Sequence, residues 1–434
     1  MGSTTKTGNG ITKLTNCRLL RGDELVWDDL WVSSTTGRIV QSQAAFYDDL
    51  IVPNDVIDLG GRIVSPGFID SQLNGAFGFN FSTVLDDMSL YDQSIRDLNK
   101  KLVQTGVTSY VPTVTSQTSA LYQRVLPHLA SSSASSSRDA SSGAESLGAH
   151  VEGPFLNPLR NGVHNVAVLR RATSLADLES VYGAANLTPS TIKMITLAPE
   201  LSPETTKTLI PALRSRDIIV SIGHSNATYE EASAAVSAGA TMITHLFNAM
   251  APLHHRNPGI FGVLGGLPSH SCPPPYFGII ADGIHLHPTT TKIAFNAHPD
   301  GLVLVTDAMH MAGLPDGRYP WRNGTDDNWI LKRGAVLVLE GRETTIAGSS
   351  TLLINCVNNF VKWTGAGVPR ALGAVTATPA AMLGLSGKKG TLEPGADADL
   401  VVLSDGDEEN GTTDLAVDEV WKFGVRVFQK RKKA

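Results

Sequence analysis

The stretch from Ile218 to Pro258, IIVSIGHSNATYEEASAAVSAGATMITHLFNAMAPLHHRNP, contains two short apolar runs that each end in a histidine, His224 and His245. The segment between them has the composition of a helix, with Asn226 or Thr228 as its N-cap. This alternation predicts two successive parallel strands that each carry one histidine at the carboxyl end. Neutral imidazoles that converge at one edge of a parallel sheet are suitable ligands for a divalent transition metal.

The same pattern extends along the chain in both directions. Eight apolar runs alternate with helical or loop segments, and each ends in polar, glycine- or proline-containing sequence: IVSPGFIDSQLNG, TSYVPTVTS, SLGAHVEGPF, IKMITLAPE, IIVSIGHS, TMITHLFN, FGIIADGIH and LVLVTDAMH. Eight βα units close a (β/α)8 TIM barrel, which is an α/β fold. Because active sites of such barrels lie at the carboxyl ends of the strands, these polar residues should share one rim.

The two ends of the chain differ in character from the predicted barrel. Residues 1–62 and 387–434 contain short β elements separated by turn signals. We therefore expect one small β-sandwich built from both chain ends, with a catalytic barrel at 63–386 inserted into it. Residues 130–146 are rich in serine, and we expect them to form a flexible surface insertion in the barrel.

Composition excludes several classes of protein. The 434-residue chain has a net charge of −6, which gives no footprint for nucleic-acid binding. No apolar run approaches the length of a membrane span, and the first residues lack the apolar core of a signal peptide. The three cysteines, Cys17, Cys272 and Cys356, are far apart and odd in number, which indicates a reduced, cytoplasmic protein.

Three residues at the predicted rim have the chemistry of metal ligands: Glu152, His224 and His245. Two histidines and one carboxylate leave positions open for water and substrate, as in many catalytic sites for zinc and similar ions. A single histidine would be better interpreted as a polar residue that ends a strand. Two histidines with a glutamate favour one divalent ion per subunit, zinc first, with cobalt, manganese and iron as alternatives.

Two further residues meet the other requirements of hydrolysis. Asp307 ends the last run, where a carboxylate can accept a proton from water and later donate it to a leaving group. Its alternative role is to accept backbone hydrogen bonds where the barrel closes. His164, in the loop RNGVHN, can polarise a substrate carbonyl or stabilise an oxyanion, although alone it would be interpreted as a surface residue.

Other polar residues indicate which chemical group the substrate carries and how many metal ions the site binds. Arg256, His285 and Asn248 can together hold a phosphate or carboxylate group. The first run ends in GFIDSQLNG, in the frame where many barrel metallohydrolases carry His-x-His, but here the positions are Gln72 and Asn74. Since amides are poor zinc ligands beside imidazole, we expect one ion and not two.

A resemblance to a known family rests on nine motifs: PGFIDSQLNG, HVEGPFLNP, NGVH, TLAPE, GHSNATYEEA, GATMITHLFNAMAPLHHRNPG, ADGIHLHP, LVTDAMHMAGLPDG and AGSS. In this order they resemble the N-acetylglucosamine-6-phosphate deacetylases of the amidohydrolase superfamily, from about Ile11 to Phe428. The resemblance implies that Asp307 acts as base and then acid, and that His164 binds the acetamido carbonyl. It also implies that the metal ligands are Glu152, His224 and His245.

The resemblance further implies how the substrate is held. Asn248, Ala249 and His285 would contact the sugar phosphate. Arg256 would reach the phosphate in a neighbouring subunit, which implies a homodimer. Gln72 and Asn74 match the single-metal branch of the family and are added to the candidates for substrate contact.

These inferences predict a hydrolase of amino-sugar catabolism. It would remove the acetyl group of N-acetyl-D-glucosamine 6-phosphate and release D-glucosamine 6-phosphate and acetate. One alternative is another barrel amidohydrolase that acts on a cyclic amide or an N-acyl amino acid. A further alternative is a non-catalytic sugar-phosphate-binding relative, although such proteins usually lose metal ligands that this chain retains.

Overall fold

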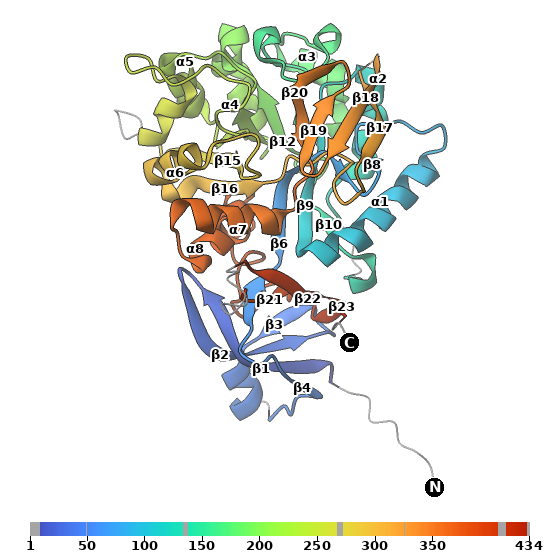
Figure 1. The fold of residues 1–434 in the computed structure, drawn as a ribbon, viewed down its shortest axis with the longest axis vertical. Helices are drawn as coiled ribbons and strands as arrows, with labels where there is room; N and C mark the ends of the chain where they lie inside the picture. The colour runs from blue at the N-terminus through green and yellow to red at the C-terminus, as the bar shows by residue number, and fades with distance from the viewer. Residues whose placement is uncertain are drawn as a thin grey trace.

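The protein consists of a parallel barrel and a smaller sheet built from both ends of the chain (Figure 1). The computed structural model describes residues 9–48, 50–132, 138–266, 272–324, 326–406 and 414–431. The first and last described strands both lie in the smaller sheet, at the bottom of Figure 1. Within the described ranges, no helix is both long enough and apolar enough to cross a membrane.

Eight parallel strands form the barrel, in their order along the chain: β6 (Phe68–Leu73), β9 (Val107–Val114), β11 (Ala149–Glu152), β12 (Ile192–Leu197), β13 (Ile219–Ile222), β14 (Met242–Ile243), β15 (Tyr276–Ile280) and β16 (Leu302–Val305). A parallel bridge between Leu73 and Ala308 joins the end of the first strand to the segment after the last. Each of the eight predicted runs contributes one of these strands. The predicted (β/α)8 barrel is therefore confirmed.

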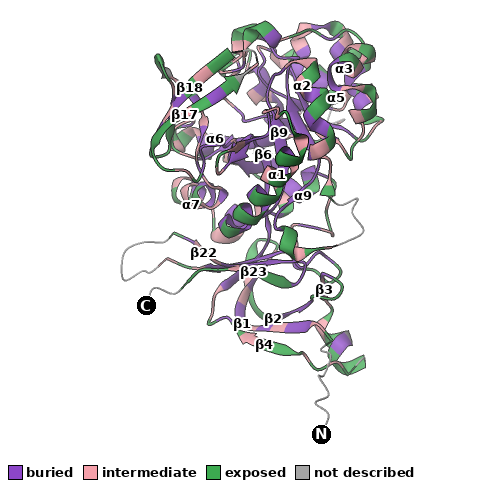
Figure 2. Ribbon diagram, turned by 90° about the vertical axis from the view of Figure 1, so that its right-hand side faces the viewer, coloured by how far each residue is buried: buried purple, intermediate pink, exposed green. Residues whose placement is uncertain are grey.

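Helices cover the outside of the barrel: α1 (Met88–Leu102), α2 (Ser119–Val125), α3 (Leu175–Tyr182), α4 (Ile210–Arg214), α5 (Tyr229–Ala238), α6 (Pro288–Ala297), α7 (Leu353–Thr364) and α8 (Val368–Gly373). Helix α9 (Ala377–Met382) instead packs Ala380 and Met382 in a separate cluster with residues of the strands, among them Met194 and Met242. Figure 2 shows buried strands inside and exposed helix faces outside. Helix α5 begins with a capping box, in which Thr228 Oγ1 accepts from Glu231 N and Glu231 Oε2 accepts from Thr228 N. Of the two predicted caps, the structure therefore selects Thr228.

The smaller sheet contains eight strands: β1 (Ile11–Arg21), β2 (Glu24–Ser33), β3 (Arg38–Val40), β4 (Asp55–Asp58), β5 (Ile63–Pro66), β21 (Leu400–Ser404), β22 (Ala416–Lys422) and β23 (Val425–Gln429). It surrounds an apolar core of its own, which includes Leu14, Leu30 and Val402. Strands from both chain ends thus share one sheet, as the predicted sandwich requires.

One predicted boundary is wrong. The run 63–75 was expected to belong wholly to the barrel, but β5 pairs with β1 and β21 of the smaller sheet. The division falls at Gly67, where an added Cβ would lie 2.0 Å from Thr108 Oγ1. The apolar run is continuous because both halves are buried, although they belong to different sheets.

A third sheet lies over the carboxyl end of the barrel, in orange at the upper right of Figure 1. It is a four-stranded antiparallel sheet: β17 (Gly317–Asn323), β18 (Asp326–Arg333), β19 (Val336–Leu339) and β20 (Arg342–Ser349). Its core packs Trp321, Ile330 and Leu337 against Met309, which follows the last barrel strand. The sheet thereby forms one wall above the rim.

The serine-rich segment is more ordered than expected. Residues 133–137 lie outside the described residues, but Glu145 and Ser146 form strand β10, which adds to β9 in parallel. Glu145 Oε1 lies 2.5 Å from the Nζ atoms of both Lys389 and Lys422. The prediction of a flexible surface insertion is therefore wrong for this end of the segment, because long-range ion pairs bury it against the smaller sheet.

Replacing Lys422 by methionine is expected to destabilise the protein by about 3–5 kcal/mol. The ammonium group is fully buried and lies 2.7 Å from Asp399 Oδ2, so its removal leaves buried carboxylates with too few partners. Urea unfolding would measure the loss. Lys430→Met, at an exposed position, is the matched control. Equal unfolding free energies for the two variants would contradict a stabilising role for the buried charges.

Candidate active site

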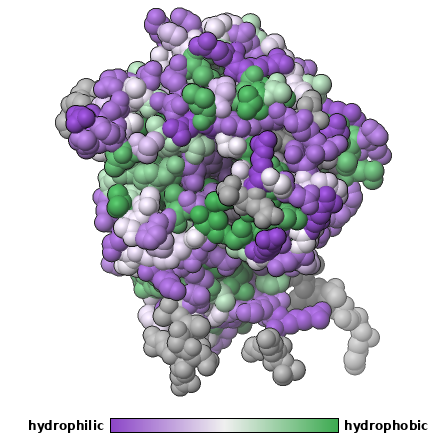
Figure 3. All heavy atoms as spheres, turned by 45° about the horizontal axis from the view of Figure 1, so that its top comes forward, coloured by the Kyte–Doolittle hydropathy of each residue, from purple (hydrophilic) through white to green (hydrophobic). Residues whose placement is uncertain are grey.

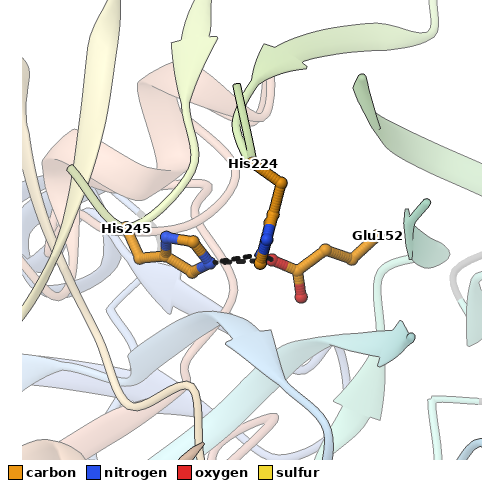
Figure 4. A group of neighbouring side chains, drawn as sticks. All are labelled: Glu152, His224 and His245. Carbon is orange, nitrogen blue, oxygen red and sulfur yellow. Dashed lines mark hydrogen bonds and ion pairs between the residues drawn. The ribbon is translucent and has the colours of Figure 1, made fainter. Parts of the chain in front are cut away.

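The candidate metal ligands lie at the ends of three barrel strands, β11, β13 and β14, with β12 between the first two. Glu152 is the last residue of β11, while His224 and His245 each follow two residues after β13 and β14. Parallel strands place these ends at one rim, and Figure 4 shows the three side chains directed toward one another. All three residues are buried.

The three side chains fit one divalent ion. Glu152 Oε1 lies 3.2 Å from His224 Nε2 and 2.9 Å from His245 Nε2, and the two Nε2 atoms are 3.1 Å apart. Ligand atoms bound to a tetrahedral zinc ion at ordinary bond lengths are about 3.3–3.5 Å apart, close to this triangle. His224 Nδ1 donates to Arg160 O at 2.8 Å, which leaves the Nε2 lone pair available for a metal.

The carboxylate of this triad is held in its ionised form. Burial opposes ionisation of Glu152, but its interactions with the His224 and His245 side chains outweigh burial and hold the pKa well below its usual value. An ionised carboxylate beside two imidazoles is the form that binds a cation. The triad therefore has the donor atoms, arrangement and charge that a divalent ion requires.

Asp307 lies beside the triad, two residues after β16. Its Oδ1 accepts hydrogen bonds from Asn74 Nδ2 at 2.7 Å and from Gln72 Nε2 at 3.2 Å. Burial, followed by the nearby Glu152 charge, raises the pKa of Asp307 to about 6. A carboxyl group that titrates in this range can both accept and donate a proton at neutral pH.

The amides of the first strand therefore contact carboxylates. Gln72 Nε2 also donates to Glu152 Oε1 at 3.2 Å, so one amide joins the triad to Asp307. Asn74 lines the pocket at this rim, whereas Gln72 is not among the residues that line it. The expected substrate contact by Gln72 is thus replaced by contacts to two acidic side chains.

His164 is a neutral hydrogen-bond donor. Its Nδ1 accepts from the backbone N of Ser116 at 3.2 Å, and a backbone N can only donate. Burial, with the charge of His224 as the next cause, lowers the pKa of His164 to about 3. The proton of the neutral ring is therefore on Nε2, which is available to a carbonyl oxygen in the pocket.

The rim surrounds a pocket of ≈ 200 Å³. Figure 3 shows this face of the molecule, with a hollow near its centre. Nine of the predicted site residues line the pocket: Asn74, Glu152, His164, His224, His245, Asn248, Ala249, His285 and Asp307. These nine residues come from six of the eight strand ends or the loops after them, and Thr115, which follows β9, adds a seventh.

Two predicted phosphate-binding residues have different surroundings. His285 lines the pocket. Its Nδ1 lies 2.7 Å from Asp282 Oδ2, and this contact fixes the orientation of the imidazole ring. Arg256 is exposed and is not among the pocket-lining residues, and its Nη1 lies 2.9 Å from His255 Nε2. Within one chain, the structure does not place Arg256 at the pocket.

The apolar lining of the pocket was not among the predicted site residues. It comprises Val163, Ile280, Met309, Trp321 and Ile346. Trp321 and Ile346 come from the sheet β17–β20, which lies far from the other site residues in sequence. The glycine-, proline-, aspartate- and aromatic-rich character of residues 313–328 predicts a lid or hairpin over the site, and the structure pairs β17 with β18 in antiparallel fashion there.

The backbone at the rim is strained. Ten described residues other than glycine have a positive φ, and five of them lie in this region: His224, His245, Phe247, Ala249 and Asp307. Such conformations cost free energy and persist where surrounding contacts impose them, as at functional sites. This concentration supports the assignment of the rim as the active site.

Comparison with known proteins agrees with this geometry. Residues 63–427 match the amidohydrolase family, so the chain belongs to that family. The N-acetylglucosamine-6-phosphate deacetylase of Danio rerio is 41% identical over 97% of both chains, which confirms the resemblance drawn from the motifs. The human enzyme of the same name is 40% identical over 92% of this chain and 93% of its own.

Solved structures give the same result. The N-acetylglucosamine-6-phosphate deacetylase of Pasteurella multocida has a TM-score of 0.77 and 26% identity, covering 96% of this chain and 99% of that one. A variant of the Mycobacterium smegmatis enzyme, in complex with N-acetyl-D-glucosamine-6-phosphate, has a TM-score of 0.76 and 28% identity. It covers 96% of this chain and 98% of its own.

Proposed function

We propose that this chain hydrolyses the acetamide of N-acetyl-D-glucosamine 6-phosphate to D-glucosamine 6-phosphate and acetate, in amino-sugar catabolism. The observation that carries the proposal is the grouping of a metal-binding triad, an acid–base carboxyl and a neutral imidazole donor around one pocket. Relatives that bear the name of this activity match nearly the full chain.

The reaction uses three kinds of group. Glu152, His224 and His245 would hold a divalent ion, which would supply Lewis-acid chemistry to the carbonyl and to the attacking water. Asp307 accepts a proton from the attacking water, and His164 Nε2–H donates to the carbonyl oxygen as negative charge develops there. As the C–N bond breaks, Asp307 gives its proton to the amine nitrogen, so that the products are acetate and the free amino sugar.

The amides of the first strand have a positioning role in this scheme. Asn74 and Gln72 both donate to Asp307 Oδ1, which orients the carboxylate toward the pocket. They occupy the places where other barrel metallohydrolases carry histidines, so we propose a single ion, with zinc as the native metal and cobalt, manganese or iron as substitutes. The three cysteines are unpaired, which supports a cytoplasmic location.

The acetate-release assay tests the substrate directly. N-acetylglucosamine 6-phosphate is expected to have a kcat/KM about 30–100-fold or more above that of unphosphorylated N-acetylglucosamine, because charged hydrogen bonds to the phosphate are lost. N-acetylgalactosamine 6-phosphate and a cyclic amide are the comparison substrates, since a relative 29% identical bears the name of a deacetylase for the former. Equal rates with and without phosphate would overturn the proposal.

We also propose a homodimer in which Arg256 reaches the phosphate in the partner's pocket. Its exposure and its place outside the pocket of its own chain support this arrangement. His285, Asn248 and Ala249 would contact the sugar phosphate from within the same chain.

Arg256→Ala is expected to raise KM about 10–100-fold, the effect of losing a charged hydrogen bond to phosphate. Co-expression with Asp307→Asn gives the decisive test. A mixed dimer of the two variants contains one site with both Asp307 and the partner's Arg256, so activity at low substrate should return. Failure of the mixed dimer to exceed both parent variants would contradict contact across the interface.

A further inference from the structure

Glu200 lies outside the pocket but joins three loops of the active-site rim. It is in the short turn after β12, and its carboxylate accepts three hydrogen bonds. Asn157 Nδ2 lies 2.8 Å and Asn226 N 2.6 Å from Oε1, while Ser225 Oγ lies 2.7 Å from Oε2. The donors belong to the loops after β11 and β13, so one carboxylate connects the ends of three successive strands.

The loop after β13 contains the candidate ligand His224, two residues after the strand ends. Its backbone has φ +48°, a conformation that an L-residue adopts only when neighbouring contacts hold it there. The next two residues, Ser225 and Asn226, are the ones bound by Glu200. The carboxylate thus fixes the chain immediately after the strained ligand.

The loop after β11 also forms hydrogen bonds with His224. Asn157 N donates to His224 O at 2.9 Å, and Arg160 O accepts from His224 Nδ1 at 2.8 Å. The side chain of Asn157 donates to Glu200 and accepts from Leu159 N at 2.9 Å, which begins the turn that presents Arg160 O. The position of this carbonyl therefore depends on Glu200.

The carboxylate of Glu200 suits this network because each of its three hydrogen-bond partners donates to it. The NH groups of Asn157 and Asn226 cannot accept, and Ser225 Oγ already accepts from Ala227 N at 3.0 Å. A glutamine has one accepting oxygen and one donating amide. With its oxygen toward Asn157 and Asn226, it would present its amide to Ser225 Oγ, which would have to turn its hydroxyl hydrogen away and lose the hydrogen bond that it donates in the wild type.

We propose that Glu200 is a positioning residue that sets the ring and backbone of His224 for metal binding. This inference rests on the proposed function only in taking His224 as a metal ligand. Partners behind a ligating histidine commonly change metal affinity by about 10–100-fold.

The test compares Glu200→Gln with Glu204→Gln, which removes a charge four residues further along the chain without touching the three donors. Zinc affinity is measured by competition with a chromophoric chelator, and the thermal midpoint is measured on metal-free protein. Glu200→Gln is expected to bind zinc about 10–100-fold more weakly than wild type, with the metal-free midpoint equal to that of the control. Ser225→Ala, which removes one donor, should weaken binding less.

Two results would overturn the inference. Wild-type zinc affinity in Glu200→Gln would show that the network does not act on the ligand. A metal-free midpoint that falls well below that of Glu204→Gln, with Ser225→Ala binding zinc normally, would make the role one of general stability. Lack of zinc binding by the wild type would instead refute the proposed function and this inference together.

Discussion

Asp307→Asn is expected to lower kcat for acetate release by about 10³–10⁴-fold, or about 4–5.5 kcal/mol in activation free energy. The loss is large because one carboxyl group serves as base in the first step and as acid in the second. Asparagine has nearly the same shape, so the fold and the three candidate metal ligands remain. Steady-state acetate release, metal content and the thermal midpoint would be measured on the same preparation.

The pH profile adds an independent check. The pKa of Asp307 is raised to about 6 by burial and by the charge of Glu152. Since the base must be ionised to accept a proton, wild-type kcat/KM should fall as the pH drops below about 6. The residual activity of Asp307→Asn should not show this fall at low pH. Asp300→Asn, at a largely exposed side chain, is the matched control. Near-normal turnover by Asp307→Asn would refute the assignment.

Removal of the divalent ion, or its loss in His245→Ala, is expected to reduce acetate release to the assay background. The ion supplies several kcal/mol of charge stabilisation that no other group at the rim replaces. His245 Nε2 lies 2.9 Å from Glu152 Oε1, so the alanine substitution removes one of the three candidate ligands. Metal content and activity would be measured together after chelation.

Re-addition of single metals completes this experiment. Zinc, cobalt, manganese and iron should each restore activity to the chelated wild type, and none should restore it to His245→Ala. His128→Ala is the control for loss of a histidine, because His128 pairs with Asp92 away from the rim. Full activity after exhaustive chelation, verified by metal analysis, would exclude the proposed metal dependence.

Local pattern was sufficient to predict the barrel. Each strand is a short apolar run followed by polar residues, and that pattern reflects burial of the strand and exposure of its carboxyl end. The pattern failed at 63–66 because buried strands that belong to different sheets have the same composition. The segment β5 is as apolar as β6, and only its pairing with β1 and β21 separates the two.

The prediction from composition is also wrong at Glu145. A serine-rich neighbourhood predicts exposure, yet this carboxylate is buried by lysines 244 and 277 residues further along the chain. No local rule could identify these partners, because they are brought together only when the chain ends fold against the barrel.

The sequence by itself determined which residues reach the rim. Strand direction places Glu152, His224, His245 and Asp307 at one edge, whatever the loops do. Tertiary structure decided what those residues do there. The tautomer of His164 depends on Ser116 N, and the orientation of Asp307 depends on Asn74. These contacts join side chains to partners on other strands, and their distances follow from the closure of the barrel and not from local sequence.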